Sequence, residues 1–482
     1  MRNYKISATS YYNLSRCHRR VYLDLYGNPE ERGEHSDFLQ LLWEKGIQIE
    51  KEILEKIKKD RTVDEVVGYP SQDTFSETIK LMSTGSPLIY QGVLIDEDKI
   101  GRPDLLERIE GNSKFGTYQY IPCDIKSGRA TEGKDGEDIK AHYADQILFY
   151  GNLLEKIQGI KPTIGKLIDI EGVETNFQLE EYDPDYKQNT LIINSIAYDK
   201  KEPELQISGT CKECIWCDHC LKLANEKRDP TLLFKLGKQK YALRDRGIRT
   251  IEDLSQINIA EFLLPQNKIP RAGEKTLHQW KRRALVWIDN KPVLHNRSSF
   301  RSTTREIYYD IEDDPSVDNV YLHGIIEVKN GKKDNYKNFC AWDKCEEEKA
   351  ARLMWEYIDS LSDNDVIYHY GSYEKTKLKR LKEKYNLSES ALEKFDRLRI
   401  DLYRELEKSS DWPTYSYGIK SIAKILNFKW TAEDASGANS IVWYNDYRKN
   451  PESRKDLLDK ISTYNKEDCE AMIVVKNWLS KA

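Results

Sequence analysis

The order of hydrophobic and polar positions predicts alternating helices and strands over the first half of the chain. Apolar side chains recur at helical spacing from Asp37 to Ile57, and a second helix is expected from about Ile139 to Ile157. Short apolar runs separated by Asp/Gly turns predict strands at Leu88–Ile95, Gly101–Ile109 and Thr117–Ile125. This alternation is typical of an α/β domain.

The C-terminal part repeats this alternation after a segment of different character. We expect strands at Glu306–Ile311 and Val320–Val328, followed by helices, the last of which ends near Leu479. From Glu226 to Arg305 there are 18 Lys and Arg against 8 Asp and Glu, a local charge of +10 in a chain of net charge −5. A polyanionic partner is therefore expected to bind locally basic surface. These changes predict three domains, at 1–224, 225–300 and 301–482.

Length and composition agree with several folded domains. The chain has 482 residues, which at roughly 100–200 residues per domain suggests about three. No run approaches the ~18 apolar residues of a membrane span, and the first residues lead into no signal-peptide core. Nine cysteines, four of them between Cys211 and Cys220, indicate metal binding in a reducing compartment instead of a disulfide framework. We expect a cytoplasmic protein.

Charged residues stand at the ends of two of the expected strands. Gly101-Arg102-Pro103-Asp104 opens one, and Asp124-Ile125-Lys126 closes another. Side chains at i and i+2 of a strand share a face, so Asp124 and Lys126 point the same way. Two carboxylates can hold a divalent cation, and a lysine can position water or stabilise charge on a phosphate. Gln146 and Tyr150, four residues apart, project together from the next helix.

In order and spacing, these residues resemble the PD-(D/E)XK nucleases, in particular the RecB branch and the related CRISPR-associated iron–sulfur exonucleases. The resemblance implies a restriction-endonuclease-like fold for residues 1–224. It also implies that Asp104 and Asp124 bind Mg²⁺ or Mn²⁺ and that Lys126, Gln146 and Tyr150 are catalytic.

One member of that family pattern differs in this chain. The family usually has Gly-x-x-x-His on the preceding helix, whereas Gly46 is followed here by Glu50 in the histidine position. Glutamate is a good ligand for magnesium or manganese, so we expect Glu50 to bind metal. The alternative is a solvated glutamate on a helix rich in Glu and Lys.

The cysteine run packs four thiols into ten residues, Cys211 to Cys220. Structural zinc sites usually split their cysteines into two distant pairs, so the run is closer to iron–sulfur ligation, with zinc or a metal-free thiol cluster as alternatives. The RecB-like iron–sulfur nucleases carry one cysteine near the N-terminus and a later Cys-x2-Cys-x5-Cys. The resemblance implies a 4Fe-4S cluster held by Cys17, Cys211, Cys214 and Cys220, with Cys217 surplus.

A second acidic set lies in the C-terminal part. Asp310 and Glu312 share one face of a strand, and Tyr464 lies one turn before Asp468 on the last helix. This set resembles the DnaQ-like 3′→5′ exonucleases, which have an RNase H-like fold, four acidic metal ligands and a tyrosine or histidine that orients water. The resemblance implies that Asp310, Glu312, Glu374 and Asp468 bind metal and that Tyr464 is catalytic. Glu374 stands where aspartate is usual. The alternatives are that Glu374 is a surface acid and that Tyr464 is a buried packing residue.

The basic middle resembles a helix–hairpin–helix segment, which holds the phosphate backbone without selecting bases. The alternative is a helical linker with solvated charges. Tyr417–Ser421 is expected to face DNA or to pack between helices. The candidate phosphate-binding residues are Lys238, Lys240, Arg244, Arg246 and Arg249.

Both acidic sets imply phosphodiester hydrolysis. We therefore expect an α/β multidomain DNA nuclease with a PD-(D/E)XK domain, a helix–hairpin–helix-like bridge and an RNase H-like domain, acting in repair, defence or CRISPR adaptation. One alternative is a nucleic-acid-binding scaffold with one inactive site, for which Glu50 and Glu374 are the grounds. Another is an exonuclease that trims RNA.

Overall fold

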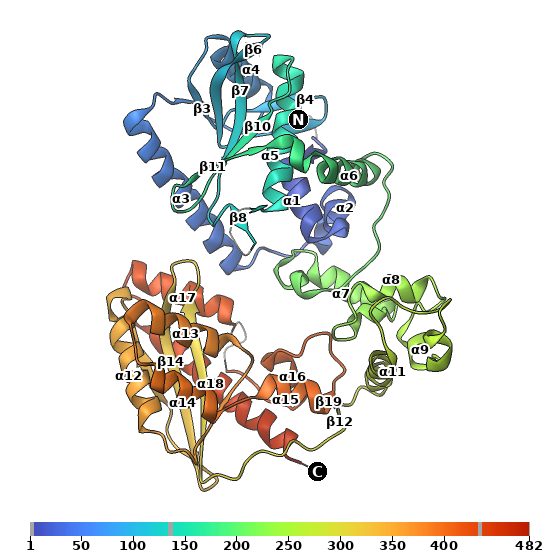
Figure 1. The fold of residues 1–482 in the computed structure, drawn as a ribbon, viewed down its shortest axis with the longest axis vertical. Helices are drawn as coiled ribbons and strands as arrows, with labels where there is room; N and C mark the ends of the chain where they lie inside the picture. Colours follow the sequence, from blue (N-terminus) through green and yellow to red (C-terminus); the bar gives the residue numbers. More distant parts are fainter. Residues whose placement is uncertain (1–3, 134–137, 432–435, 482) are drawn as a thin grey trace. The chain divides into compact units, whose positions relative to one another are not determined.

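The computed structural model describes residues 4–133, 138–431 and 436–481. The chain forms two compact units (Figure 1): the first is Met1–Leu205 with Thr210–Cys220, the second Gln206–Gly209 with Leu221–Ala482. None of the helices in these described ranges is long and apolar enough to cross a membrane. The domain boundaries expected at residues 224 and 300 stay predictions.

A six-stranded mixed sheet forms the core of the first unit, in the order β11-β10-β7-β6-β3-β2. Its central strand β7 (Gly116–Ile125) pairs antiparallel with β6 (Leu105–Ser113) and parallel with β10 (Ile164–Ile168). The outer strands are β3 (Leu88–Tyr90), β2 (Asp64–Glu65) and β11 (Glu174–Gln178). The described residues of this unit form two smaller sheets as well. One has three strands, in the order β1 (Ile6–Ser7), β5 (Lys99–Gly101) and β4 (Leu94–Asp96), and the other pairs β8 (Thr131–Glu132) with β9 (Asp138–Ile139).

Two of the expected strands are interrupted, and both breaks adjoin the candidate site. Leu88–Ile95 was expected as one strand but forms β3 and β4, separated by a turn in which Gln91 has a φ of 57°, in the left-handed region. Gly101–Ile109 is divided between β5 and β6, because Pro103 has no N–H to donate to a neighbouring strand. Asp104 lies in this second break.

The helices of the first unit include both that the sequence predicted. The expected helix 139–157 is α5 (Ala141–Gln158), which packs against β7 and ends at Gly159, whose φ of 77° suits a glycine after a helix. The expected helix 37–57 is α3 (Asp37–Asp60). The others are α1 (Ala8–Arg16), α2 (His18–Tyr26), α4 (Gln72–Ser83) and α6 (Leu179–Ala197), while α7 (Cys217–Glu226) begins in the first unit and continues into the second.

Short helices of the basic segment begin the second unit and are fastened to its C-terminal part. Arg283 is 1% exposed, lies 5.2 Å from the ring centroid of Phe234 and 5.5 Å from that of Tyr417, and donates from Nε to Asp411 Oδ1 at 2.9 Å. A buried, paired guanidinium of this kind ties the segments together. The helices are α8 (Gln239–Arg244), α9 (Ile251–Ser255), α10 (Ile259–Leu263) and α11 (Glu274–Asp289).

A second mixed sheet, in the order β15-β14-β13-β17-β18, supports the C-terminal site. Strand β13 (Arg305–Asp314) pairs antiparallel with β14 (Asn319–Lys329) and parallel with β17 (Val366–His369). The two strands expected here lie within β13 and β14 and are confirmed. The remaining strands are β12 (Val293–Leu294), β15 (Lys332–Lys333), β16 (Lys337–Cys340), β18 (Arg399–Asp401) and β19 (Ser410–Asp411).

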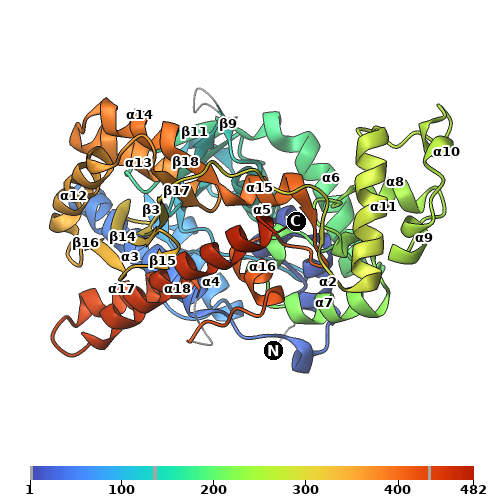
Figure 2. The same cartoon turned by 90° about the horizontal axis from the view of Figure 1, so that it is seen from below.

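Helices cover both faces of this sheet (Figure 2). Ile307, Tyr309 and Ile311 of β13 share a core with α12 (Glu347–Ser360), α13 (Tyr373–Tyr385) and α14 (Glu389–Leu398). Tyr308 points to the other face, towards α15 (Leu402–Ser409), α16 (Ile419–Ile425) and α18 (Asp456–Leu479). A further helix, α17 (Gly437–Lys449), precedes α18 in the chain. Because strand side chains alternate, Asp310 and Glu312 lie on the face of Tyr308 and α18.

Candidate active sites

Three acidic side chains meet between β13 and α18. One ligand oxygen of each of Asp310, Glu312 and Asp468 lies within 4.8 Å of the other two. No other set of three His, Cys, Asp or Glu side chains among the described residues meets this spacing. Converging carboxylate oxygens are the hard ligands that Mg²⁺ and Mn²⁺ prefer, so the donor set fits a divalent cation.

The electrostatics of this acidic cluster favour a cation. Burial and the neighbouring Asp468 raise the pKa of Glu312 to about 8. Burial also raises the pKa of Asp468 to about 6, although Lys420 opposes the shift. The pKa of Asp310 rises well above its usual value, because of burial and the charges of Glu312 and Asp468. Three acids that resist ionisation together are stabilised as carboxylates by a bound divalent ion.

The remaining two predicted residues of this set lie beside the cluster. Tyr464 is 5% exposed, donates a hydrogen bond to Asp468, and has a pKa raised well above its usual value by burial and by Asp468. Glu374, at the start of α13, is buried and accepts a hydrogen bond from Nδ1 of the buried His369 at 3.3 Å. The charge of Glu374 contributes to the raised pKa of Asp310, but its oxygens lie outside the 4.8 Å group.

Trp430 and Lys420 complete the surroundings of the cluster, and of these two only Trp430 was not singled out from the sequence. Trp430 donates from Nε1 to Asp468 Oδ1 at 2.7 Å. Lys420 of α16 places its Nζ 4.5 Å from the ring centroid of Tyr464 and 5.5 Å from that of Trp430. Burial lowers the pKa of Lys420, and the carboxylate of Asp468 opposes that shift. Tyr417–Ser421 was expected to face DNA or to pack, and Lys420 of this segment lies beside the acidic cluster.

A second group of charged residues occupies the first unit, where β6 and β7 adjoin. Lys126 Nζ donates to Asp124 Oδ2 at 2.8 Å. Asp104 accepts from the backbone N–H of Ile125 at 2.7 Å, and its own N–H donates to Asp124 Oδ1 at 3.2 Å. Burial raises the pKa of Asp104 well above its usual value, and Asp124 and Glu50 add to the rise. Burial disfavours the ammonium of Lys126, but Asp124 and Asp104 outweigh it and raise its pKa.

Helix α5 contributes Gln146 and Tyr150 to the same place. Gln146 Oε1 accepts a hydrogen bond from Lys126 Nζ at 3.0 Å. Tyr150 OH donates to the backbone oxygen of Arg102 at 3.4 Å, and burial raises the pKa of Tyr150 well above its usual value. The structure therefore brings together the lysine, both aspartates and the two helix residues that the sequence placed in one site.

Glu50 of α3 belongs to this group as well. Its Oε1 accepts hydrogen bonds from Tyr90 OH at 2.8 Å and from Gln91 Nε2 at 2.6 Å. Gln91 Nε2 also lies 3.2 Å from Asp104 Oδ1, so one amide links the two carboxylates. Sequence reasoning missed Gln91, because it treated residues 88–95 as one regular strand.

Five cysteines of the first unit come from distant parts of the chain. Cys17 lies between α1 and α2, and its thiol pKa is raised by burial and by Cys211. Burial raises the pKa of Cys220 to about 12, and Cys17, Cys211 and Cys214 contribute to the rise. Burial and the neighbouring Cys211 raise the pKa of Cys217 to about 11. The thiol from the N-terminal helices thus lies near those of the later run.

The predicted phosphate-binding residues fall into two kinds. Lys240 is 7% exposed and donates to Asp229 Oδ2 at 2.9 Å, and Arg246 donates to the backbone oxygens of Asn267 and Lys268 at 2.6 Å each. Lys238 and Arg249 are exposed, and Arg244 is partly exposed beside Asp245.

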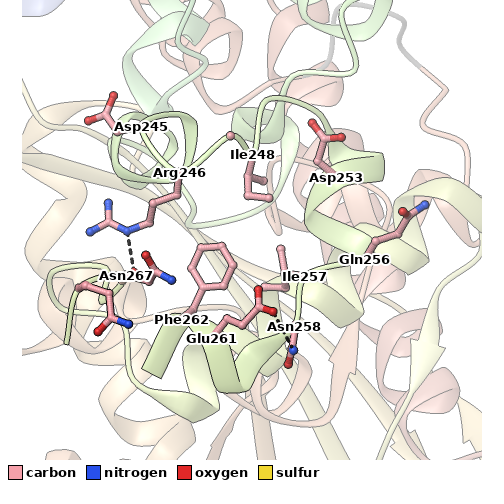
Figure 3. A pocket seen from close by; sticks show the side chains of 12 residues that line it. Asp245, Arg246, Ile248, Asp253, Gln256, Ile257, Asn258, Glu261, Phe262 and Asn267 are labelled. Atoms are coloured by element: carbon pink, nitrogen blue, oxygen red, sulfur yellow. Dashed lines mark hydrogen bonds between the residues drawn. The ribbon is translucent and has the colours of Figure 1, made fainter. Parts of the chain in front are cut away.

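Arg246 borders an open pocket of about 690 Å³ between the short helices (Figure 3). Three carboxylates, those of Asp245, Asp253 and Glu261, line the same pocket. Phosphate groups are repelled by such a lining, so the pocket itself is unsuited to a nucleic-acid backbone.

Comparison with known proteins assigns the C-terminal part of the chain. Residues 307–480 match the model of the RNase H superfamily, a span that contains Asp310, Glu312, Glu374, Tyr464 and Asp468. No curated protein matches the chain. The match and the acidic cluster together indicate metal-dependent phosphodiester hydrolysis. Residues 307–480 are a domain of the RNase H superfamily.

Proposed function

We propose that the protein is a metal-dependent DNA nuclease whose C-terminal domain removes nucleotides from 3′ ends. The observation that carries this proposal is the convergence of Asp310, Glu312 and Asp468 within 4.8 Å on an RNase H superfamily domain. Two Mg²⁺ or Mn²⁺ ions held there, with Glu374 as a further ligand, would activate a water and stabilise the leaving 3′ oxygen.

The protein's own residues have separate tasks in this proposal. Tyr464, kept protonated by its raised pKa, donates to Asp468 and is placed to orient a water beside it. Lys420, adjacent to Tyr464, provides positive charge for the phosphate that enters the site. His369 orients the Glu374 carboxylate through the hydrogen bond from its Nδ1.

End-labelled DNA tests this activity. Labelled at its 5′ end, DNA should be shortened stepwise from its 3′ end in Mg²⁺ or Mn²⁺, whereas this stepwise shortening should be absent in EDTA and with Asp310→Asn. Asp459→Asn, an exposed acid on the same helix as Asp468, is the matched control and should digest normally. Digestion of RNA but not DNA would favour the RNA-trimming alternative, and binding without digestion would favour a scaffold.

We also propose that the first unit is a RecB-like PD-(D/E)XK nuclease. Support comes from the hydrogen bonds of Lys126 to Asp124 and Gln146, and from the proximity of Glu50 to Asp104 through Gln91. Hard oxygen ligands there suit Mg²⁺ or Mn²⁺, and the protonated Lys126 suits charge on a phosphate. A nuclease with two sites fits DNA processing in repair or defence.

The cysteines support a 4Fe-4S cluster in the same unit, held by Cys17, Cys211, Cys214 and Cys220. The support is that Cys17, from between α1 and α2, lies near Cys211 of the later run, where closely spaced Cys-x-x-Cys pairs suit iron–sulfur ligation.

A further inference from the structure

We propose that Asn465 is a positioning residue that holds Asp310 and Glu312 side by side before a cation binds. The inference rests on the proposed function of the C-terminal site. Asn465 lies on α18 between Tyr464 and Asp468 and is fully buried, with 0% exposure. Its Nδ2 lies 2.8 Å from Asp310 Oδ2 and 3.3 Å from Glu312 Oε1, so the two N–H groups of one amide can serve both acids.

The surroundings of Asn465 fix the direction of this amide. Tyr336 OH donates to Asn465 Oδ1 at 2.8 Å, which leaves Nδ2 directed at the carboxylates. Gly324 of β14 lies opposite Asp310 in the sheet, and a Cβ atom added there would lie 1.6 Å from Asn465 Oδ1 and 2.7 Å from the Tyr336 hydroxyl. The absence of a side chain at this strand position therefore makes room for the amide.

The chemistry of an amide suits this position better than that of a charged donor. Two adjacent carboxylates repel each other, and N–H donors stabilise them without neutralising their charge. A lysine would compensate the charge and compete with the metal. Each carboxylate oxygen also keeps lone pairs that the amide does not use, so both acids can still bind a cation.

Substitution of the amide separates positioning from packing. With the candidate site of the first unit disabled by Asp124→Asn in every protein compared, Asn465→Ala should weaken Mn²⁺ binding, measured by titration calorimetry, about 10-fold or more, as is typical for residues that orient metal ligands. The near-isosteric Asn465→Asp should lower the thermal midpoint of unfolding in EDTA, because a carboxylate added to those of Asp310, Glu312 and Asp468 increases their mutual repulsion. Addition of Mn²⁺ should then raise that midpoint by more than in the wild type, since the cation relieves the repulsion. Asn477→Asp, exposed on the same helix, should behave as wild type.

A second route avoids substituting Asn465 itself. Gly324→Ala should displace the amide and lower Mn²⁺ affinity as Asn465→Ala does, and Tyr336→Phe should lower it less. Unchanged Mn²⁺ affinity in both Asn465→Ala and Gly324→Ala, with affinity lost in Asp310→Asn, would overturn the inference and leave the proposed function standing. Full Mn²⁺ affinity in Asp310→Asn would refute the proposed function, and the inference with it.

Discussion

Lys126, directly after the end of β7, donates from Nζ to Oε1 of Gln146 on α5, at 3.0 Å. The same Nζ reaches Asp124, whereas Asp310 belongs to the other compact unit. Groups within one site act together and separate sites fail separately. Lys126→Ala should therefore remove cleavage by the first unit, by at least 100-fold, and leave 3′-end digestion intact, while Asp310→Ala should do the reverse.

The measurement uses circular DNA and 5′-labelled linear DNA side by side, with each variant and the double variant. Lys140→Ala is the matched control: its Nζ lies 5.5 Å from the centroid of the Tyr143 ring, as that of Lys126 lies 4.8 Å from it, but Lys140 donates to the backbone oxygen of Arg129. Loss of all cleavage in either single variant would show that the two sites are coupled or that only one of them cuts.

His323 should make the second unit sensitive to acid. Burial lowers the pKa of this fully buried imidazole to about 3, whereas an unfolded histidine titrates near pH 6.5. Below pH 6.5 the unfolded chain therefore binds a proton that the folded state excludes, and the free energy of unfolding falls by up to about 1.4 kcal/mol per pH unit. Urea unfolding at pH 7 and pH 5 measures this loss. His323→Gln should reduce the difference, and the exposed His278→Gln should not.

Charge reversal in the basic segment should weaken DNA binding equally for all sequences. Lys238→Glu and Arg249→Glu change exposed residues, and each should lower affinity several-fold at low salt and flatten its dependence on salt. Fluorescence anisotropy on two unrelated duplexes provides the measurement. Lys332→Glu, exposed on β15, gives the same change of net charge elsewhere. Equal affinity in all these variants would show that the segment is only a linker.

Cys17 should be required for iron in the first unit. Purified under anaerobic conditions, the protein should contain about four iron and four sulfide ions per chain, as a 4Fe-4S cluster requires. Cys17→Ser should lose the iron and lower the thermal midpoint of the first unit, while Cys345→Ser, an exposed cysteine of the second unit, should keep it. One zinc ion per chain without sulfide would contradict the cluster.

The sequence predicted those features that depend on spacing within one element. Asp310 and Glu312 share a face because strand side chains alternate, and Gln146 and Tyr150 share one because they are four residues apart. Side chains whose role depends on distant partners were not predictable in this way. Gln91 and Asn465 became candidates only when the fold brought each between two carboxylates.

Charge counting in the basic segment had a similar limit. Lys240 and Arg246 contribute to the local excess of +10 just as Lys238 does. In the structure, however, Lys240 is buried against Asp229 and Arg246 holds backbone oxygens of a neighbouring loop. Composition shows how many Lys and Arg residues a segment has, but not which of them already bind partners within the protein.

The guanidinium of Arg283, which lies beside the stacked rings of Phe234 and Tyr417 and is paired with Asp411, has a consequence for how digestion would proceed. It joins the basic helices to the domain that carries Asp310, within one compact unit. Under the proposed function, a DNA strand bound by those helices stays bound to the unit that carries the active site after each nucleotide is released. Since backbone contacts are indifferent to sequence, the strand can advance by one step without dissociating. Digestion would then be processive, with many nucleotides removed in each encounter.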